Sequence, residues 1–251
     1  ARFHAGMALA AYAADAAGWT KADADFLAAQ LLASNPDNQR DLRSNLEPIG
    51  GQLLEPLEVR FRDAAARDTV REAAANALAD FAANDPARLA GLASEATSEQ
   101  YRIIYPRLIA AQAEQRAAAE KALLAITQQQ PGAKVPESDR VQLGRRRAGA
   151  AISLLRMGQR ESTFDVFRVQ EDPESLTQFV HRVKDRGVGP AELLDCLARA
   201  TEERVRFGLL LALGEFTLAD IAESRRQALT ERLLDWYRTD PSSAIHGACG
   251  W

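Results

Sequence analysis

The chain has 251 residues, of which 47% are apolar and 26% are charged, so it is long enough and apolar enough to bury a substantial core. The net charge of −4 argues against a general nucleic-acid binder, although a local basic face remains compatible with it. No apolar stretch approaches the roughly 20 residues that span a bilayer, and the first residues lack the form of a secretory signal. We therefore expect a cytoplasmic protein that does not bind membranes.

Alanine dominates the apolar residues, and β-branched runs of the kind that strands need are nearly absent. The sequence therefore predicts an all-α fold. In chain order, helices are expected near residues 1–17, 22–34, 39–47, 51–63, 67–83, 86–95, 98–110, 112–129, 138–157, 160–168, 173–186, 190–199, 202–214, 221–238 and from 242 onward.

The breaks between these helices follow ordinary capping chemistry. Four Asp-Pro or Asn-Pro pairs suit helix starts, at 35–36, 85–86, 172–173 and 240–241. Gly18, Gly158 and Gly214 suit helix ends. The clearest loop is a polar insertion at 128–138 with two prolines, and the stretch from Pro48 to Pro56 is expected to be irregular.

A short phrase recurs along the chain and predicts how the helices assemble. It consists of Arg or His, small residues three and six positions later, and Leu at the seventh, offsets that share one helix face. Copies open at Arg2, Arg71, Arg116, Arg147, Arg206 and His246, with a degenerate copy at 172–180. A face repeated about every 30–45 residues predicts two-helix units stacked on one another. We expect about six to seven units in one domain over 1–251, degenerate over 1–65.

The first residue of each copy has two interpretations. It can form a ladder of side chains that lines a binding groove. It can also tie the stack together by pairing with an acidic residue of the neighbouring unit, which regular recurrence favours. We predict the stacking role for Arg2, Arg71, Arg116, Arg147, Arg206 and His246.

The phrase resembles the second helix of HEAT repeats, most closely at Val205–Gly214 and Val70–Leu78. The family pattern also places Asp, often followed by Pro, just before this helix, and Asp240–His246 fits it with His in place of Arg. The resemblance covers most of the chain and implies a right-handed, armadillo-like α-solenoid. Residues 1–65 depart from it most.

A narrower resemblance joins RFHAGMALAAY, DFAANDPARLAGL, LGEF and DPSSAIHGACGW, in that order. This series looks like the HEAT-like segment of large multidomain bacterial proteins that carry a Ser/Thr kinase domain or a formylglycine-generating sulfatase-modifying domain. Both ends of the chain interrupt a phrase, so we expect a fragment of a longer protein. The kinase signature motifs are absent from the sequence.

Two places could form a binding surface. Arg145, Arg146 and Arg147 are the strongest basic cluster, with Arg140 and Arg156 nearby, and could contact phosphates or an acidic partner. Trp236 and Tyr237 are adjacent aromatics near a helix end, and both residue types are enriched at binding hot spots. The alternatives are a solvated helix turn for the first and packing between the last two units for the second.

No residues form a recognisable catalytic or cofactor-binding motif. His4, His181 and His246 lack the i, i+4 spacing of a helical metal site, and no glycine-rich loop can hold phosphate. Cys196 and Cys249 have no metal-ligand spacing and are expected to be reduced and packed. We expect no catalytic residue, no metal and no cofactor.

The expected function is a non-catalytic scaffold that binds a protein or peptide, or spaces neighbouring domains. One alternative is a catalytic HEAT-like fold of the DNA alkylpurine glycosylase type, which needs a basic concave face with Trp and Asp close together. A second is a regulatory segment of a kinase or sulfatase-modifying protein. A third is a lyase-like or chromophore-associated HEAT protein, which resembles this chain only at the level of the repeat.

Overall fold

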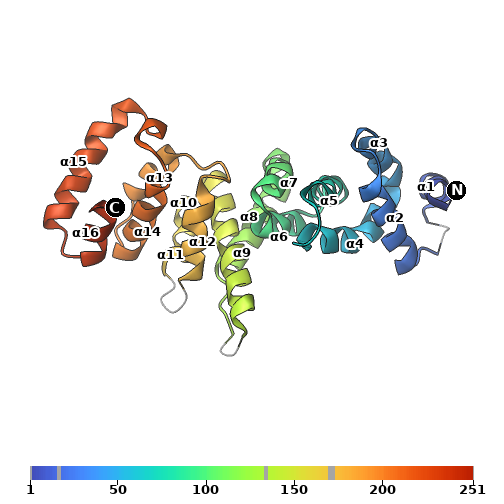
Figure 1. Cartoon of the computed structure of the whole chain (residues 1–251), viewed down its shortest axis with the longest axis horizontal. Coiled ribbons are helices and arrows are strands. Elements are labelled where there is room, and N and C mark those ends of the chain that lie inside the picture. The colour runs from blue at the N-terminus through green and yellow to red at the C-terminus, as the bar shows by residue number, and fades with distance from the viewer. Residues whose placement is uncertain (1, 16–17, 133–134, 169–172, 251) are drawn as a thin grey trace. The chain divides into compact units, whose positions relative to one another are not determined.

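A computed structural model describes residues 2–15, 18–132, 135–168 and 173–250. Within these ranges the secondary structure is helical and no strand occurs, as the composition predicted (Figure 1). The helices are α1 (Arg2–Ala13), α2 (Lys21–Ala33), α3 (Pro36–Leu46), η1 (Glu47–Ile49), α4 (Gly50–Arg62), α5 (Asp68–Phe81), α6 (Pro86–Glu95), α7 (Ser98–Ala110), α8 (Ala113–Thr127), α9 (Glu137–Arg156), α10 (Arg160–Thr163), α11 (Asp165–Arg168), α12 (Glu174–Val183), α13 (Pro190–Leu197), α14 (Glu203–Gly214), η2 (Leu218–Asp220), α15 (Glu223–Thr239) and α16 (Ser243–Gly250).

Side chains at the predicted breaks cap the helices that follow them. The Asn35 side chain accepts a hydrogen bond from the Asp37 amide at the start of α3, at 3.0 Å. Asp85 accepts from the Arg88 amide at the start of α6, at 2.9 Å. These bonds satisfy amides that have no partner inside the helix. Asp172, where the degenerate phrase copy begins, lies outside the described residues, and Pro173 stands at the N-cap of α12.

Gly158 ends α9 as predicted, with a φ of +89° that a residue with a Cβ rarely adopts. The Gly158 amide bonds to the Leu155 carbonyl and the Gln159 amide to the Leu154 carbonyl, each at 2.9 Å, which closes the last turn. One expected helix is interrupted at Phe164. The single helix expected over 160–168 is two short helices, α10 and α11, so that prediction was wrong.

The stretch from Pro48 to Pro56 is more regular than the sequence suggested. Pro48 lies in the 3-10 turn η1, and α4 begins directly at Gly50 with Pro56 inside it. The Leu57 and Phe61 side chains that follow on α4 are buried. Burial of this apolar face supports the helix although proline removes one of its hydrogen bonds.

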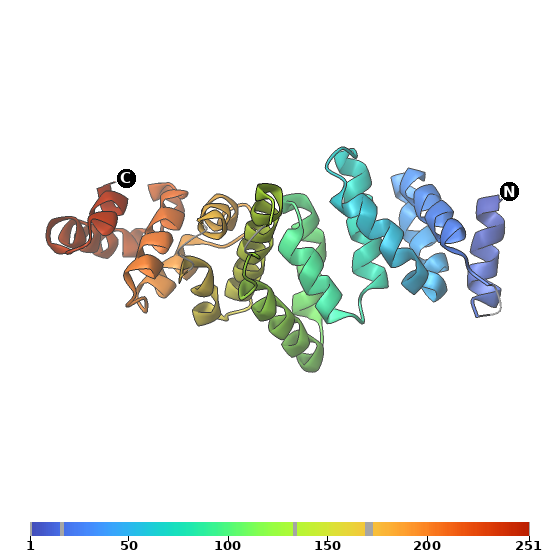
Figure 2. The same cartoon turned by 90° about the horizontal axis from the view of Figure 1, so that it is seen from below.

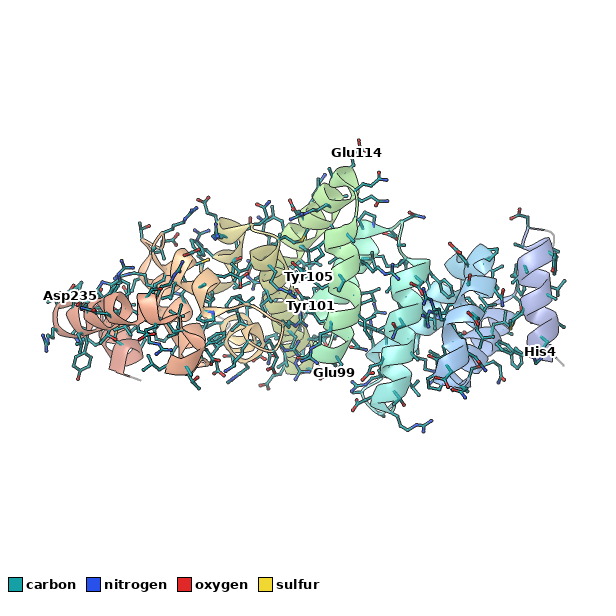
Figure 3. The ribbon with its side chains drawn as sticks, turned by 90° about the horizontal axis from the view of Figure 1, so that it is seen from above. His4, Glu99, Tyr101, Tyr105, Glu114 and Asp235 are labelled. Atoms are coloured by element: carbon teal, nitrogen blue, oxygen red, sulfur yellow. The ribbon has the colours of Figure 1, made fainter. Side chains whose placement is uncertain are left out.

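The contacts divide the chain into two compact units, and the first comprises residues 1–92 and 99–119. Within it α4 packs on both α2 and α5, and Figure 2 shows the same helices from below. Asp80 on α5 accepts from Arg43 on α3, with Nε to Oδ2 at 2.7 Å, and from Arg107 on α7. One carboxylate therefore ties three helices together. On α7 the buried rings of Tyr101 and Tyr105 stack with centroids 5.1 Å apart (Figure 3).

The second unit comprises residues 93–98 and 120–251, and α9 runs through its core. Every residue from Arg147 to Leu155 on α9 is buried. This helix packs mainly against α12, and its apolar side chains join a cluster that reaches α14 and Ile245 of α16. The cluster brings together segments that lie up to about a hundred residues apart in the sequence.

The repeat phrase lies on helices in all six copies, in α1, α5, α8, α9, α14 and α16. In α5 the phrase residues Ala74, Ala77 and Leu78 are completely buried. The copy in α1 differs, because its Leu9 side chain remains 48% exposed. The phrase therefore predicts the helix correctly, whereas burial of its face also depends on which helix lies against it.

Candidate functional site

The phrase residues of the last two copies meet at Asp240, between α15 and α16. Arg206 Nη1 on α14 donates to Asp240 Oδ2 at 2.6 Å, and the His246 ring on α16 contacts the Asp240 backbone carbonyl. The Asp240 side chain is only 5% exposed, and its other oxygen accepts from the Ser242 amide at 3.0 Å. The hydrogen bond from the Ser242 amide, followed by the Arg206 guanidinium, lowers the pKa of the Asp240 carboxyl below its usual 3.8. The Asp240 carboxylate therefore links α14 to the turn before α16.

The other phrase arginines reach different partners. Arg2 Nη2 lies 3.3 Å from Asp23 Oδ1 on α2, in an exposed pair between helices. Arg71 pairs with Asp68 of its own helix rather than with a neighbouring one. Arg147 donates from Nε to the Thr127 carbonyl at the end of α8, at 2.9 Å. Arg116 lies on α8 and is half-buried. The same position in the phrase therefore leads to an ion pair, an intrahelical pair or a helix-end contact.

The basic cluster on α9 divides into buried and accessible residues. Arg147 is 1% exposed, so it does not belong to a binding surface, and that part of the prediction was wrong. Its position in the phrase places it on the core face of α9, where its Nε donates to the Thr127 carbonyl. Arg145 is exposed and Arg146 is half-buried. Burial lowers the pKa of Arg182 on α12, and the positive charge of Arg145 lowers it further.

The two adjacent aromatics on α15 also separate into different environments. The Trp236 ring packs against the core cluster of the second unit, and the Arg206 guanidinium lies over it at 5.4 Å from the ring centre. Tyr237 is 52% exposed. The Tyr237 ring lies 6.2 Å from that of His246. Of the pair, only Tyr237 offers most of its ring to a partner.

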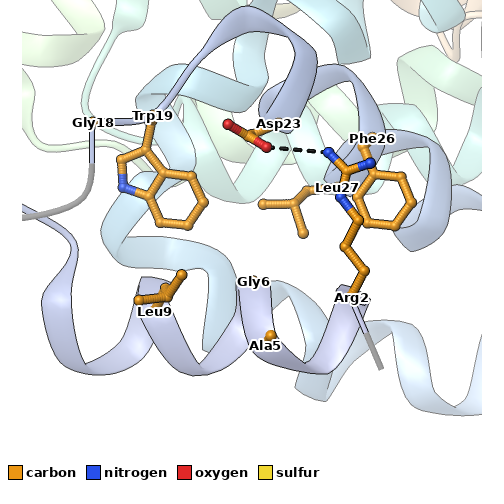
Figure 4. A pocket seen from close by; sticks show the side chains of 9 residues that line it. All are labelled: Arg2, Ala5, Gly6, Leu9, Gly18, Trp19, Asp23, Phe26 and Leu27. Carbon is orange, nitrogen blue, oxygen red and sulfur yellow. Dashed lines mark hydrogen bonds and ion pairs between the residues drawn. The ribbon is translucent and has the colours of Figure 1, made fainter.

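A cavity of about 250 Å³ lies between α1 and α2 in the first unit (Figure 4). Its polar groups already have partners within its own wall. Trp19 Nε1 donates to the Ala14 carbonyl at 2.9 Å, and Arg2 both pairs with Asp23 and lies over the Phe26 ring at 4.4 Å. The Thr20 hydroxyl and amide lower the pKa of Asp23 below its usual value. The cavity thus presents mainly apolar walls and few groups that could orient a ligand.

A larger cavity of about 640 Å³ opens between α3 and the first half of α5. Leu32 at the end of α2 and Ala73 on α5 give it a buried apolar floor. Arg40, Arg43 and Arg67 stand along its walls. We call this cavity the α3–α5 groove. No sequence pattern marks it, because it combines residues from three helices and only their packing brings these together.

Two further buried polar residues connect segments of the chain. Arg186, in the turn that follows α12, is 2% exposed and donates from Nη1 to the Ala93 carbonyl at 3.0 Å, and from Nη2 to the Ala96 carbonyl. It thereby neutralises carbonyls at the C-terminal end of α6. Gln100 is equally buried and donates to the Phe61 carbonyl at 2.8 Å. Nothing in the sequence around either residue marks it as buried.

The thiols and other metal-ligating side chains form no site among the described residues. Cys196 is buried and Cys249 is half-buried, and neither is in a disulfide. Burial raises the pKa of the Cys196 thiol to about 11. Over the described ranges, no three His, Cys, Asp or Glu side chains are grouped so that they could hold a metal ion. No described helix is long and apolar enough to cross a bilayer.

No family model, no curated protein and no solved structure matches this chain.

Proposed function

We propose that this chain is a HEAT-like α-solenoid that binds a protein partner and performs no catalysis itself. Stacked helical units create extended surfaces for binding without needing a dedicated catalytic residue. The accessible side chains best suited to such binding are Arg145, Tyr237 and the arginines of the α3–α5 groove.

The observation that carries this proposal is one helix face that is repeated and buried. In α5, α9 and α14 the phrase places a small or apolar residue at its third, sixth and seventh offsets, and these side chains are 8% exposed or less. In α8 the residues at the third and seventh offsets, Ala119 and Leu123, are completely buried. Helices that repeat one buried face at intervals of tens of residues are typical of repeat arrays.

The stacking role predicted for the phrase arginines is kept for Arg206 in the same proposal, whereas Arg71 pairs with Asp68 of its own helix. Arg206 and Asp240 lie 34 positions apart and still form a short ion pair with the carboxylate largely buried. A pair of this kind orients one helical unit on the next, since a guanidinium and a carboxylate fit together in few geometries. Its role is therefore to fix how units stack, which leaves exposed residues for partners.

The test is affinity capture with the purified chain, followed by reconstitution from purified components. Proteins that the immobilised chain captures are compared with those captured by an unrelated immobilised protein of similar net charge. Any specific partner is purified and titrated against the chain. The proposal predicts direct, saturable binding, and it is refuted if no purified partner binds the chain directly.

A further inference from the structure

The α3–α5 groove has the chemistry of a binding site for an acidic peptide. Its volume of about 640 Å³ lies within the roughly 300–1,000 Å³ that is usual for ligand pockets. Its floor is apolar, and polar and charged groups stand along its walls. A groove of this kind can bury part of a ligand while a few polar groups set its orientation.

Two guanidinium groups in the groove are available to a ligand. Arg40 on α3 and Arg67 at the start of α5 are both exposed, and within the described ranges neither side chain forms a hydrogen bond or ion pair. Arg43, by contrast, is held by Asp80 through Nε at 2.7 Å. Each unpaired guanidinium offers a planar set of donors that matches a carboxylate. The groove therefore presents two carboxylate-binding positions on opposing helices.

The side-chain amides of the groove suit a peptide backbone. Gln39 donates to the Ser34 carbonyl at 3.2 Å, and Asn76 donates to the Glu72 carbonyl at 2.9 Å. Each amide group has an oxygen and a second N–H besides this donor. A peptide backbone supplies both complements, an N–H and a carbonyl, at every residue. The amide oxygens thus add recognition of a backbone N–H, which an inorganic anion does not supply.

We propose that the α3–α5 groove binds an acidic segment of a partner polypeptide. Carboxylates of the segment pair with Arg40 and Arg67, while its backbone bonds to the amides of Gln39 and Asn76. This inference rests on the proposed partner-binding function and assigns the place and the chemistry of that binding. The Glu72 carboxylate in the same wall repels negative charge, so the carboxylates of the segment lie at Arg40 and Arg67 and not beside Glu72.

Fluorescence anisotropy with the purified chain tests this proposal. The probes are a short fluorescein-labelled peptide of alternating Glu and Ala, a matched peptide with Gln in place of Glu, and a single-stranded DNA of similar length. The test variant is Arg40→Glu/Arg67→Glu, and the control is Lys121→Glu/Arg204→Glu, which makes the same change in net charge at exposed positions in the second unit. Far-UV circular dichroism checks that both variants stay folded, as expected for exposed sites.

We expect the acidic peptide to bind the natural chain at least about tenfold more tightly than the Gln peptide, and the groove variant to lose most of that difference. The control variant should bind like the natural chain. The proposal is overturned if the acidic peptide does not bind, if both variants weaken binding equally, or if DNA binds more tightly than the peptide through the same two arginines.

The groove and the wider function can fail separately. A partner identified by affinity capture that binds the Arg40→Glu/Arg67→Glu variant as tightly as the natural chain would place its site elsewhere, and only the groove assignment would fall. Conversely, specific binding of the acidic peptide with no partner found by affinity capture would leave the groove standing and remove the proposed scaffold role.

Discussion

Gly149 on α9 is the position where a single added methyl group should disturb the second unit most. A Cβ built on Gly149 would lie 1.9 Å from the Ser94 carbonyl oxygen and 2.6 Å from Arg186 Nη1. Neither neighbour can give way easily. Ser94 contributes backbone, and Arg186 is buried and bonded to the Ala93 carbonyl at 3.0 Å. The Gly149→Ala substitution must therefore push α9 away from the end of α6.

The size of the effect follows from three opposing contributions. Alanine gains about 1 kcal/mol of helix propensity over glycine. To reach even 3.0 Å from the new Cβ, the Ser94 carbonyl must retreat by at least 1.1 Å. Overpacking of this kind costs about 1–3 kcal/mol. Stretching the bond from Arg186 to Ala93 costs about 1.5–3 kcal/mol, because a buried charge loses an acceptor. We expect Gly149→Ala to lower the free energy of unfolding by about 3 kcal/mol.

Chemical and thermal unfolding followed by circular dichroism measure this change. A loss of about 3 kcal/mol corresponds to a fall in melting temperature of about 6–12 °C for a protein of this size. The matched control is Gly91→Ala on α6, where the new Cβ has no atom within 4 Å. That change should be neutral or stabilise by about 0.4–1 kcal/mol. If Gly149→Ala were as stable as Gly91→Ala, the close approach of α9 to residues 93–98 would be refuted.

Three further predictions concern the end of the second unit. Because folding lowers the pKa of Asp240, its carboxylate stabilises the fold above pH 3.8 and loses that effect as the pH falls through the lowered value. The difference in free energy of unfolding between the natural chain and Asp240→Asn, measured in urea, should therefore shrink below about pH 4. A difference that stays constant with pH would contradict this. Cys196 should resist a thiol reagent at pH 8 until the protein is unfolded, since it is buried and its pKa is about 11. The half-buried Cys249 should react sooner. Spectrophotometric thiol titration of Cys196→Ser and Cys249→Ser, each of which leaves one thiol, measures the two rates separately. Trp236→Ala should lower the free energy of unfolding by about 2 kcal/mol or more, and Tyr237→Ala by about 0.5 kcal/mol or less, because only Trp236 packs against the core. Denaturant titrations measure both values, and equal losses of free energy of unfolding would contradict the different burial of the two rings.

Most helices could be predicted from the sequence because their boundaries depend on local chemistry. The cap at Asn35, the proline that follows it and the turn at Gly158 each act within a few residues, so a linear reading finds them. The division of 160–168 was missed because neither proline nor glycine marks the break at Phe164. Phe164 and Phe167 both pack in the core of the second unit, and their spacing of three positions also suits one continuous helix face.

The candidate sites were harder to predict because they depend on which helices meet. The run Arg145–Arg147 looks uniformly basic in the sequence, yet its last member is buried and the first is exposed. Helical periodicity explains this difference, since one step along a helix turns a side chain by about 100°. The groove arginines Arg40 and Arg67 are 27 positions apart, and only the packing of α3 beside α5 brings them to one cavity.

The phrase itself shows where sequence periodicity stops being informative. Arg147 and Arg206 occupy the same phrase position, yet one bonds to a backbone carbonyl at a helix end and the other to a buried carboxylate. In both cases the guanidinium reaches beyond its own helix, to the end of α8 or to the turn before α16. The neighbouring segment determines which acceptor it meets. The position does not itself require such a contact, since Arg71 pairs within α5 and His246 replaces Arg in the last copy. Substitution by Lys would keep the charge but lose the planar set of donors. It should therefore lower the free energy of unfolding more at Arg206, whose partner carboxylate is buried, than at the exposed Arg2.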